Sequence, residues 1–411
     1  MLTNIELEEA QKLLLNKVAC LSAETVPILQ ALGRVNADDI LAQQNLPSCM
    51  QAARDGFAVH QDDIGNVQPV IIKEWLQVGD IPTSPVKRGE AVGVVTGGIL
   101  PEKTAAVIPC EKVQANGQQL VLSGYKSANS FIKLPGEDFK VGEVIALKST
   151  RFTPGLIGLL AAMGTKQVSV YRRPRVAILS LAKQVVSYQK DPVLGQIRDS
   201  NGPLLATLVM RDGGEIIAVN TCTGIMDSGL KIYITELLKK ADLVLTTGGT
   251  FAYQDSETCQ IFKAIGSDLI FQGIPMQPGG HNTAFRRESR LIISHSGNPA
   301  ACLVGYELLS APLIRAMQGI SPFAAQTQAV CLDDLPAKKG ERRFVRGYAR
   351  YSDNQWQVKI LPGQKPGMFR SLINYNALID IPVGNPPVKA GDEVSIILVN
   401  SFHTGNEYFQ F

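Results

Sequence analysis

The sequence predicts a multidomain α/β plus β protein. It is expected to combine a parallel-sheet α/β domain, an elongated N-terminal region with an inserted β domain, and a small C-terminal β-barrel. The first observation behind this prediction is length, because 411 residues exceed the roughly 100–200 residues of one domain. The second is that strands alternate with helices in the middle of the chain, and the third is that short strands broken by glycine and proline lie on either side.

Helical patterns open the chain and return after residue 150. Thr3 and Glu6 stand at the spacing of a capping box, and apolar residues then recur at helical period over 7–18. A second short helix is predicted over 26–32, and a third starts at the cap-like pair Thr153-Pro154. We expect these helices to pack together, so that residues 1–45 and 140–173 form one discontinuous N-terminal domain.

Residues 46–139 are predicted to form the inserted β domain. Runs such as 70–72 and 105–108 are β-branched or alternating, and glycine and proline interrupt them as they do between short strands. Asn116-Gly117 is typical of a tight hairpin turn between two such strands.

The α/β domain is predicted over 174–320 and the C-terminal β-barrel over 321–411. Four apolar strand patterns, at 176–179, 216–219, 243–245 and 291–293, each precede a helical pattern, which indicates a parallel sheet covered on both faces. The last helix should end near Gly319, because Ile320-Ser321-Pro322 does not extend a helix easily. Strand patterns then follow at 343–350, 355–361, 378–381 and 393–399.

Composition argues against several classes of function. The 40 lysines and arginines nearly balance 37 acidic residues, for a net charge of +3, so nucleic acid is a poor candidate partner. The N-terminus lacks the pattern of a signal peptide, and no uninterrupted run of about 18 apolar residues indicates a membrane span. Seven widely spaced cysteines suggest neither a zinc site nor a disulfide framework, which favours a cytoplasmic location.

Three loops of the α/β segment are candidates for ligand binding, because ligands bind outside the carboxyl ends of parallel strands. They are 196–202, 246–250 and 296–299, which contain Asp199-Ser200-Asn201, two glycines, and Asn298-Pro299. Each of them can also be read as a helix cap or a turn alone. Together they favour an anionic small molecule, since backbone N–H groups at helix starts and glycine turns bind anions.

Acidic residues stand in two further turns, at Asp55 and at Glu137-Asp138. Asp-Gly is common in hairpin turns, so Asp55 is either a turn former or a functional carboxylate. The sequence contains no serine elbow, Walker loop, GxGxxG or HExxH motif that would indicate a common hydrolase, nucleotide or zinc-protease site.

The motifs, taken in order, resemble those of the molybdopterin molybdotransferase family, which includes MoeA and the gephyrin E-domain. The resemblance runs from about residue 5 to residue 399. It is carried by these segments: Leu32-Gly33-Arg34-Val35, Asp55-Gly56-Phe57-Ala58-Val59, Thr96-Gly97-Gly98, Gly136-Glu137-Asp138, Asp199-Ser200-Asn201, Thr247-Gly248-Gly249, Met276-Gln277-Pro278-Gly279 and Gly297-Asn298-Pro299.

The resemblance implies an enzyme of molybdenum cofactor biosynthesis, usually a head-to-tail homodimer. Members of the family insert molybdenum from molybdate into adenylylated molybdopterin, with Mg²⁺ assisting the release of AMP. A molybdoenzyme or another cofactor-biosynthesis protein would be a further partner. The chemistry requires oxygen ligands for the metal and cations for the oxyanion and phosphates.

Carried over to this chain, the resemblance implies two groups of site residues. The catalytic group is Asp55, Thr96, Asp138 and Asp199, whose three acids are also the expected ligands of Mg²⁺. The cofactor-binding group is Ser200, Asn201, Thr247, Gly248, Gly249, Pro278, Gly279, His281, Gly297, Asn298, Pro299 and Arg346.

This chain departs from the family pattern at several of these positions. Gln184 replaces a glutamate of the family, and Gln277 and Gly280 replace two lysines that face molybdate. An expected acid falls at Ser256, beside Asp255. The expected serines are Ala301 and the pair Pro366-Gly367.

Losing one preorganised donor typically costs about 2.7–4 kcal/mol of transition-state stabilisation, so transfer should be slow unless His281, His295 and Lys183 rebuild the oxyanion pocket. Two hypotheses therefore stand. One is a divergent molybdotransferase, and the alternative is a catalytically degenerate paralogue that binds molybdopterin or the finished cofactor and delivers it to a partner enzyme.

Overall fold

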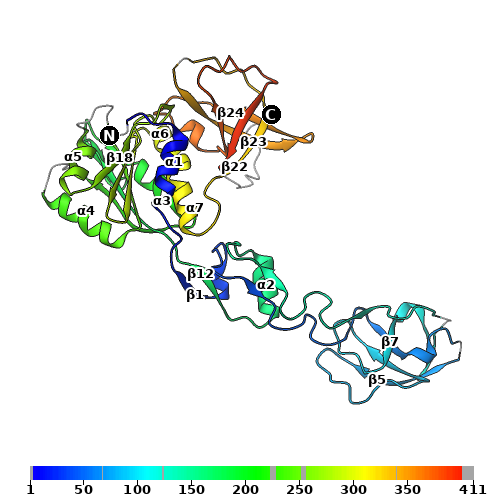
Figure 1. Cartoon of the computed structure of the whole chain (residues 1–411). Helices are drawn as coiled ribbons and strands as arrows, with labels where there is room; N and C mark the ends of the chain where they lie inside the picture. Colours follow the sequence, from blue (N-terminus) through cyan, green and yellow to red (C-terminus); the bar gives the residue numbers. More distant parts are fainter. Residues whose placement is uncertain are drawn as a thin grey trace. The chain divides into compact units, whose positions relative to one another are not determined.

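The computed structural model describes residues 3–66, 68–122, 125–222, 228–250, 256–338 and 340–399. Contacts divide the chain into two compact units. Unit 1 contains residues 1–26, 33–37 and 169–411, and unit 2 contains residues 27–32 and 38–168. Figure 1 shows the whole chain.

A six-stranded sheet forms the centre of unit 1, in the order β16-β13-β17-β21-β20-β18. The first four strands are parallel, as predicted, and β20 and β18 add an antiparallel hairpin that the sequence did not reveal. The strands are β13 (Arg175–Leu181), β16 (Glu215–Cys222), β17 (Leu243–Thr247), β18 (Asp268–Gln272), β20 (Thr283–Arg287) and β21 (Arg290–His295).

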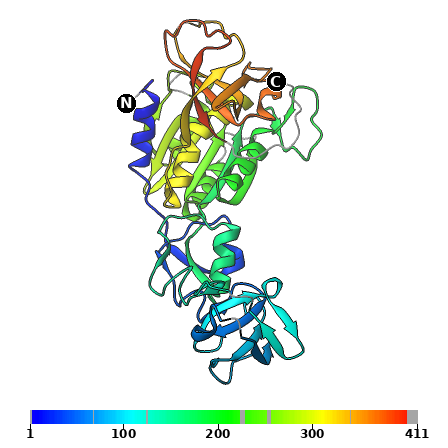
Figure 2. The ribbon, with the colours of Figure 1, turned by 90° about the vertical axis from the view of Figure 1, so that its right-hand side faces the viewer.

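Helices cover both faces of this sheet (Figures 1 and 2). Val176 and Ile178 of β13 face one apolar core, and Ala177 and Leu179 face the other. The first core is closed by α1 (Leu7–Leu15), α3 (Asn201–Arg211), α6 (Pro299–Gly305) and α7 (Ala311–Met317). The second is closed by α4 (Ser228–Lys240) and α5 (Glu257–Ala264). Burial of both faces explains the continuous apolar runs of the central strands.

Three expectations for the N-terminal helices are wrong in whole or in part. Helix α1 starts at Leu7 with Glu6 at the N-cap, and Thr3 forms a bridge to Gln272 rather than a capping box. The buried face of α1 packs in the core of unit 1 and not against the helix at 154–162. The segment after Val26 is a 3₁₀ turn, η1 (Ile28–Ala31), rather than an α-helix.

A 19-residue helical run, Pro299–Met317, crosses the core of unit 1. It joins α6 to α7 through a π-helical turn, η4 (Tyr306–Ser310), and ends beside Gly319, as predicted. The run is long and apolar enough to span a membrane, but 89% of its apolar window is buried in the protein. It is therefore placed as the core helix of a folded domain.

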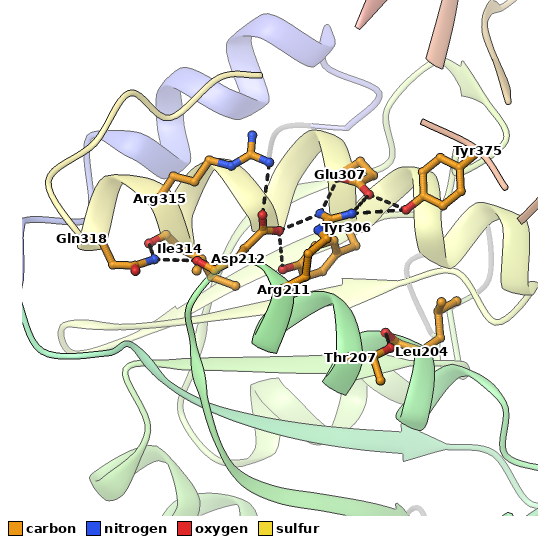
Figure 3. Close-up of polar contacts among 10 residues, drawn as sticks. All are labelled: Leu204, Thr207, Arg211, Asp212, Tyr306, Glu307, Ile314, Arg315, Gln318 and Tyr375. Carbon is orange, nitrogen blue, oxygen red and sulfur yellow. Dashed lines mark hydrogen bonds and ion pairs between the residues drawn. The ribbon is translucent and has the colours of Figure 1, made fainter. Parts of the chain in front are cut away.

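Buried ionic contacts hold this run to α3 and to the C-terminal domain (Figure 3). Arg211, at the end of α3, donates to both carboxylate oxygens of Glu307 at 2.7 and 2.9 Å. The Tyr375 hydroxyl, from the C-terminal domain, donates to the same carboxylate at 2.5 Å. Asp212 accepts from Tyr306 at 2.9 Å and from Arg315 at 3.2 Å. Burial opposes the charge on Arg211, but Glu307 and Asp212 outweigh it and raise the pKa of Arg211.

The C-terminal domain is a closed five-stranded barrel, which confirms the prediction. Its strands pair in the cycle β23-β24-β22-β26-β25 and back to β23. They are β22 (Ala325–Cys331), β23 (Arg342–Ser352), β24 (Gln355–Ile360), β25 (Ala377–Ile381) and β26 (Glu393–Leu398), with a 3₁₀ turn η5 (Arg370–Leu372). A short strand of the α/β region, β19 (Met276–Gln277), pairs with β23 and attaches the barrel to it.

Unit 2 contains a six-stranded sheet, β7-β4-β6-β5-β9-β8, with apolar cores on both faces. The Asn116-Gly117 hairpin and the Thr153 cap of α2 are confirmed. Its sheet strands are β4 (Gly56–His60), β5 (Val70–Leu76), β6 (Glu90–Val94), β7 (Thr104–Pro109), β8 (Gln114–Asn116) and β9 (Gln119–Val121).

Short elements complete unit 2. They are β2 (Ile40–Leu41), β3 (Gln51–Ala52), η2 (Gln61–Asp63), η3 (Cys110–Lys112), β10 (Ile132–Lys133), β11 (Val144–Ala146) and α2 (Pro154–Ala162). The chain enters and leaves this unit through β1 (Ala23–Pro27) and β12 (Gln167–Tyr171), which pair with each other.

Candidate functional site

The three candidate loops of unit 1 meet at the carboxyl edge of the sheet. The side-chain amide of Asn201 donates to the Thr247 hydroxyl and to the Gly297 carbonyl, both at 2.8 Å. The Thr247 hydroxyl in turn donates to the Ser296 carbonyl at 3.2 Å. Asn201 thus joins all three loops, although it is 46 residues from Thr247 and 96 residues from Gly297 in the sequence. We call this region the loop edge.

Glycine is required where the loops approach one another. Gly248 has a φ of +83°, and a Cβ atom there would lie 2.7 Å from the carbonyl oxygen of Leu181. A Cβ on Gly297 would lie 3.4 Å from the Cα of Gly248. Gly249 also has a positive φ, +65°. The backbone of 247–249 is therefore packed closely against its neighbours. Glycine turns of this kind can present backbone N–H groups to a ligand.

Several buried polar atoms at the loop edge have no hydrogen-bond partner among the described residues. They include the Ser180 hydroxyl at the end of β13, the Asn201 carbonyl oxygen, and the Ser296 hydroxyl. Strand register places Ser180 beside Thr247. Buried polar groups are nearly always hydrogen-bonded in folded proteins, so these unpartnered groups mark the loop edge as a candidate binding region.

Asp199 and its neighbours have roles in the local structure. The Asp199 carboxylate is buried and accepts from the Gly202 N–H at 2.9 Å and from the Thr221 hydroxyl at 3.0 Å. Ser200 is the N-cap residue of α3 without a side-chain cap bond, and Asn298 holds the same position before Pro299 in α6. The side chain of Asn298 is exposed and makes no capping hydrogen bond to α6.

A second feature of unit 1 is a cavity of about 300 Å³ between the 276–281 loop and the barrel. Gln277 and Pro278 form one wall. The other lining residues include four cations, Lys338, Arg343, Arg346 and Lys365. None of the described lining residues is acidic. We call it the cation cavity. The sequence predicted only Arg346 of these four.

Arg346 is almost completely buried, with 1% of its surface exposed. Its guanidinium donates to the Ser371 hydroxyl at 3.1 and 3.2 Å and to the Gly363 carbonyl at 3.4 Å. No carboxylate of the described residues forms an ion pair with it. Burial without a counter-charge lowers the pKa of Arg346 to about 10.

His295 does not supply a cation. Its ring nitrogens contact Asn282 at 2.9 Å and Ser310 at 2.8 Å, and burial lowers the pKa of His295 to about 3. The neutral ring instead supports Asn282, which donates to the Gly279 carbonyl at 2.6 Å. Lys183 is also not part of the cavity, because it is exposed and pairs with Glu257 at 3.3 Å. His281, the last residue of the 276–281 loop, is exposed.

Unit 2 brings two of the predicted residues together. The Asp55 carboxylate accepts from the backbone N–H and from the hydroxyl of Thr96, each at 2.7 Å. These two hydrogen bonds lower the pKa of Asp55, the backbone bond most. Asp138 is exposed on a turn, where its N–H donates to the Leu46 carbonyl at 3.0 Å.

The described residues contain no group of three or more His, Cys, Asp or Glu side chains arranged to hold a metal ion. Asp55 and Asp138 belong to unit 2, and Asp199 belongs to unit 1 with both carboxylate oxygens engaged. Ser256, at the position of the expected acid, caps α5 by accepting from the Cys259 N–H at 3.2 Å. Asp255 lies outside the described residues. These residues do not by themselves form a Mg²⁺ site.

Sequence reasoning missed Lys338, Arg343 and Lys365 at the cavity, and Ser180 at the loop edge, and it placed Ser296 in a candidate loop without giving it a role. A signal for the first group was present, because five lysines and arginines fall between residues 338 and 346. That cluster follows no motif, and only the barrel brings it against the 276–281 loop.

Three family models match the chain in order. The MoeA N-terminal region (domain I and II) matches residues 5–164, a probable molybdopterin binding domain matches residues 177–316, and the MoeA C-terminal region (domain IV) matches residues 328–399. Together they span almost the whole chain. The loop edge lies in the second region and most of the cation cavity in the third.

Similar proteins align along nearly the full length. A molybdopterin molybdenumtransferase of Staphylococcus aureus strain Mu50 is 28% identical over 404 residues, which cover 97% of this chain and 96% of that protein. One of Bacillus subtilis strain 168 is 29% identical over 395 residues, which cover 94% and 91%.

The fold is also that of a solved structure. A molybdopterin biosynthesis MoeA protein from Pyrococcus horikoshii OT3 superimposes with a TM-score of 0.81 at 26% identity, covering 96% of this chain and 100% of that one. The order of the three regions, the full-length alignments and the shared fold lead to one conclusion: the chain belongs to the MoeA family of molybdenum cofactor biosynthesis proteins.

Proposed function

We propose that this protein is a molybdopterin molybdenumtransferase, which inserts molybdenum from molybdate into adenylylated molybdopterin with release of AMP. The observation that carries the proposal is the loop edge, where Asn201 joins the three loops and leaves three buried polar atoms open. A pterin ring presents hydrogen-bond donors and acceptors along its edges, so it matches a site that offers a hydroxyl, an amide oxygen and backbone N–H groups.

In this proposal the residues of the chain bind and orient the substrate. Asn201, Thr247, Gly248, Gly249 and Gly297 form the rigid edge against which the pterin lies. Ser200, Asn298 and Pro299 place the starts of α3 and α6, whose N–H groups favour the phosphate charges. Pro278, Gly279, His281 and Arg346 border the neighbouring cavity or its loop, where we place the oxyanion.

The roles of Asp55, Thr96, Asp138 and Asp199 as catalytic and Mg²⁺-binding residues stay predictions of the resemblance. Their oxygen donors are of the type that Mg²⁺ prefers, but no single unit brings the three acids together. We therefore assign no step to a metal. A homodimer, a cytoplasmic location and a partner enzyme that receives the cofactor also stay predictions.

The degenerate-paralogue alternative is not favoured. Similar proteins along the whole chain are named molybdenumtransferases, and cations line the cavity beside Gln277, one of the two positions where the family carries a lysine. The loss of those lysines therefore does not leave the region without positive charge.

Complementation tests the proposal. The wild-type chain should restore molybdoenzyme activity to a bacterial strain that lacks its molybdenumtransferase, and Asn201→Ala should not. Asn385→Ala is the matched control, because the side-chain amide of Asn385 donates an exposed hydrogen bond to the carbonyl of its neighbour Pro386. Immunoblots establish equal expression. Failure of the well-expressed wild type to rescue, even at high molybdate, would contradict the proposal.

A further inference from the structure

The cations of the cavity differ from the other cations of the barrel in lacking acidic partners. Arg342 pairs with Asp380 at 2.6 Å and with Glu8 at 2.6 Å, and Lys389 pairs with Asp334 at 3.1 Å. Lys338, Arg343, Arg346 and Lys365 form no ion pair with any described carboxylate. Four positive groups therefore gather around one hollow without internal compensation.

We infer that Lys338, Arg343 and Lys365, together with Arg346, form the subsite for a tetrahedral oxyanion and supply from the barrel the charges that Gln277 and Gly280 do not. The inference rests on the proposed function for its biological substrate, molybdate. Its physical basis is independent of that function, because it concerns which side chains hold the anion.

Arg346 provides the strongest physical reason. Removing an ion from water is costly unless an opposite charge or several hydrogen bonds compensate for the lost hydration. Arg346 has a serine hydroxyl and one carbonyl for this purpose, and no carboxylate of the described chain. A dianion in the cavity would supply the missing charge.

Gln277 has a defined role in this arrangement. Its side-chain oxygen accepts a hydrogen bond from the Lys338 ammonium at 2.5 Å. The pairing of β19 with β23 sets Gln277 opposite Arg343, whose guanidinium is anchored by the Pro336 carbonyl at 2.7 Å. The amide thus holds a lysine of the barrel at the wall where the family carries its own lysine. Gln277 is a positioning residue.

The cavity adjoins the loop edge through α6. The N–H of Ala300, in the first turn of α6, donates to the carbonyl of Pro366 at 3.1 Å, and Pro366 lines the cavity. Helix α6 begins directly after Gly297-Asn298, which belongs to the loop edge. An anion in the cavity therefore lies next to the element that ends one of the three pterin loops.

Calorimetric titration of the purified full-length protein with sodium molybdate tests the inference. Wild type should bind one molybdate per chain, and Lys338→Gln and Lys365→Gln should each weaken binding about tenfold or more, the loss expected for a charge-assisted hydrogen bond. Both side chains are exposed, so neither variant should unfold. Lys389→Gln is the control, because it removes a barrel lysine that has an acidic partner.

A charge exchange sharpens the test. Gln277→Leu alone should weaken molybdate binding, because it removes the amide oxygen that holds Lys338 at the cavity wall. Combining Gln277→Lys with Lys338→Gln restores the original charge count and should return binding to within about threefold of wild type. A double variant that binds molybdate as weakly as Lys338→Gln alone would contradict the inference that charge at this wall holds the anion.

Parallel titrations with sodium tungstate and sodium sulfate identify the anion. Tungstate should compete with molybdate, and sulfate should compete less well if the cavity is sized for the larger oxyanions. Molybdate binding that is absent, or unchanged in the Lys338 and Lys365 variants, would overturn the inference even if complementation succeeds. Failed complementation with cation-dependent molybdate binding would instead count against the proposed function alone.

Discussion

The loop edge and the cation cavity are built from different kinds of residue. The loop edge consists of backbone, glycines and short neutral side chains, whose positions the sheet register fixes. The cavity consists of long cationic side chains on segments of the barrel. The resemblance predicts that most family motifs are kept at the loop edge and that two lysines are replaced beside the cavity.

This difference shows how far each kind of site tolerates change. A backbone site needs a glycine or an asparagine at one position, because the close approach leaves no room for another residue. A positive charge on a long, flexible stem can reach the same point from several positions of the chain. Loss of a motif lysine therefore does not imply loss of an oxyanion site.

The largest loss of folding stability is expected from a change at Glu307, which connects α3 to the barrel domain. Glu307 is fully buried and holds Arg211 of α3 and Tyr375 of the barrel domain (Figure 3). Glu307→Gln should lower the free energy of unfolding by about 3–5 kcal/mol, because it leaves the Arg211 charge poorly compensated. Urea denaturation measures this loss.

Glu236→Gln is the control for that variant. Glu236 forms an exposed pair with Lys239, so this change should leave the free energy of unfolding nearly unchanged. A Glu307 variant as stable as this control would show that the two regions do not depend on the buried network.

A pair of glycine variants tests the rigidity of the loop edge. Gly248 and Gly266 both have positive φ, +83° and +76°, but only Gly248 has a neighbouring carbonyl in the way of a Cβ. Gly266→Ala should cost about 1 kcal/mol for the left-handed backbone. Gly248→Ala should cost about 1–3 kcal/mol more, because the overlap with the Leu181 carbonyl must be relieved. Thermal and urea unfolding compare the two, and equal losses would contradict the close approach.

The pH dependence of stability tests the junction between the two regions, where His295 supports the 279–282 turn. The folded pKa of His295, about 3, lies below its unfolded value of 6.5, so between these pH values the unfolded chain binds the extra proton. Stability should therefore fall as pH decreases below 6.5, by about 2–3 kcal/mol between pH 6.5 and 4.5 from this group.

His295→Gln should remove that part of the slope, which urea midpoints at several pH values reveal. His60→Gln, in unit 2, is the control and should keep the slope. A slope that is the same in the wild type and in His295→Gln would mean that the ring is not kept neutral by burial.

Local patterns predicted much of the fold. The four parallel strands, the Asn116-Gly117 hairpin of the inserted domain, the α2 cap and four of the five barrel strands follow from periodicity and turn residues. The predictions failed where contacts between segments far apart in the sequence determine the local structure. Thr3 pairs with Gln272, and α1 is placed by the core of a domain more than 150 residues further along the chain.

The sequence by itself determined the order of most elements and the three loops that form the loop edge, because glycine turns, helix caps and apolar strands are encoded within a few neighbouring positions. Only the tertiary structure decided that Asn201 joins three loops, that His295 is a neutral support, and that Lys338, Arg343 and Lys365 surround the Gln277 loop. The physical reason is that charge compensation and burial depend on which distant segments pack together, and no local pattern records that packing.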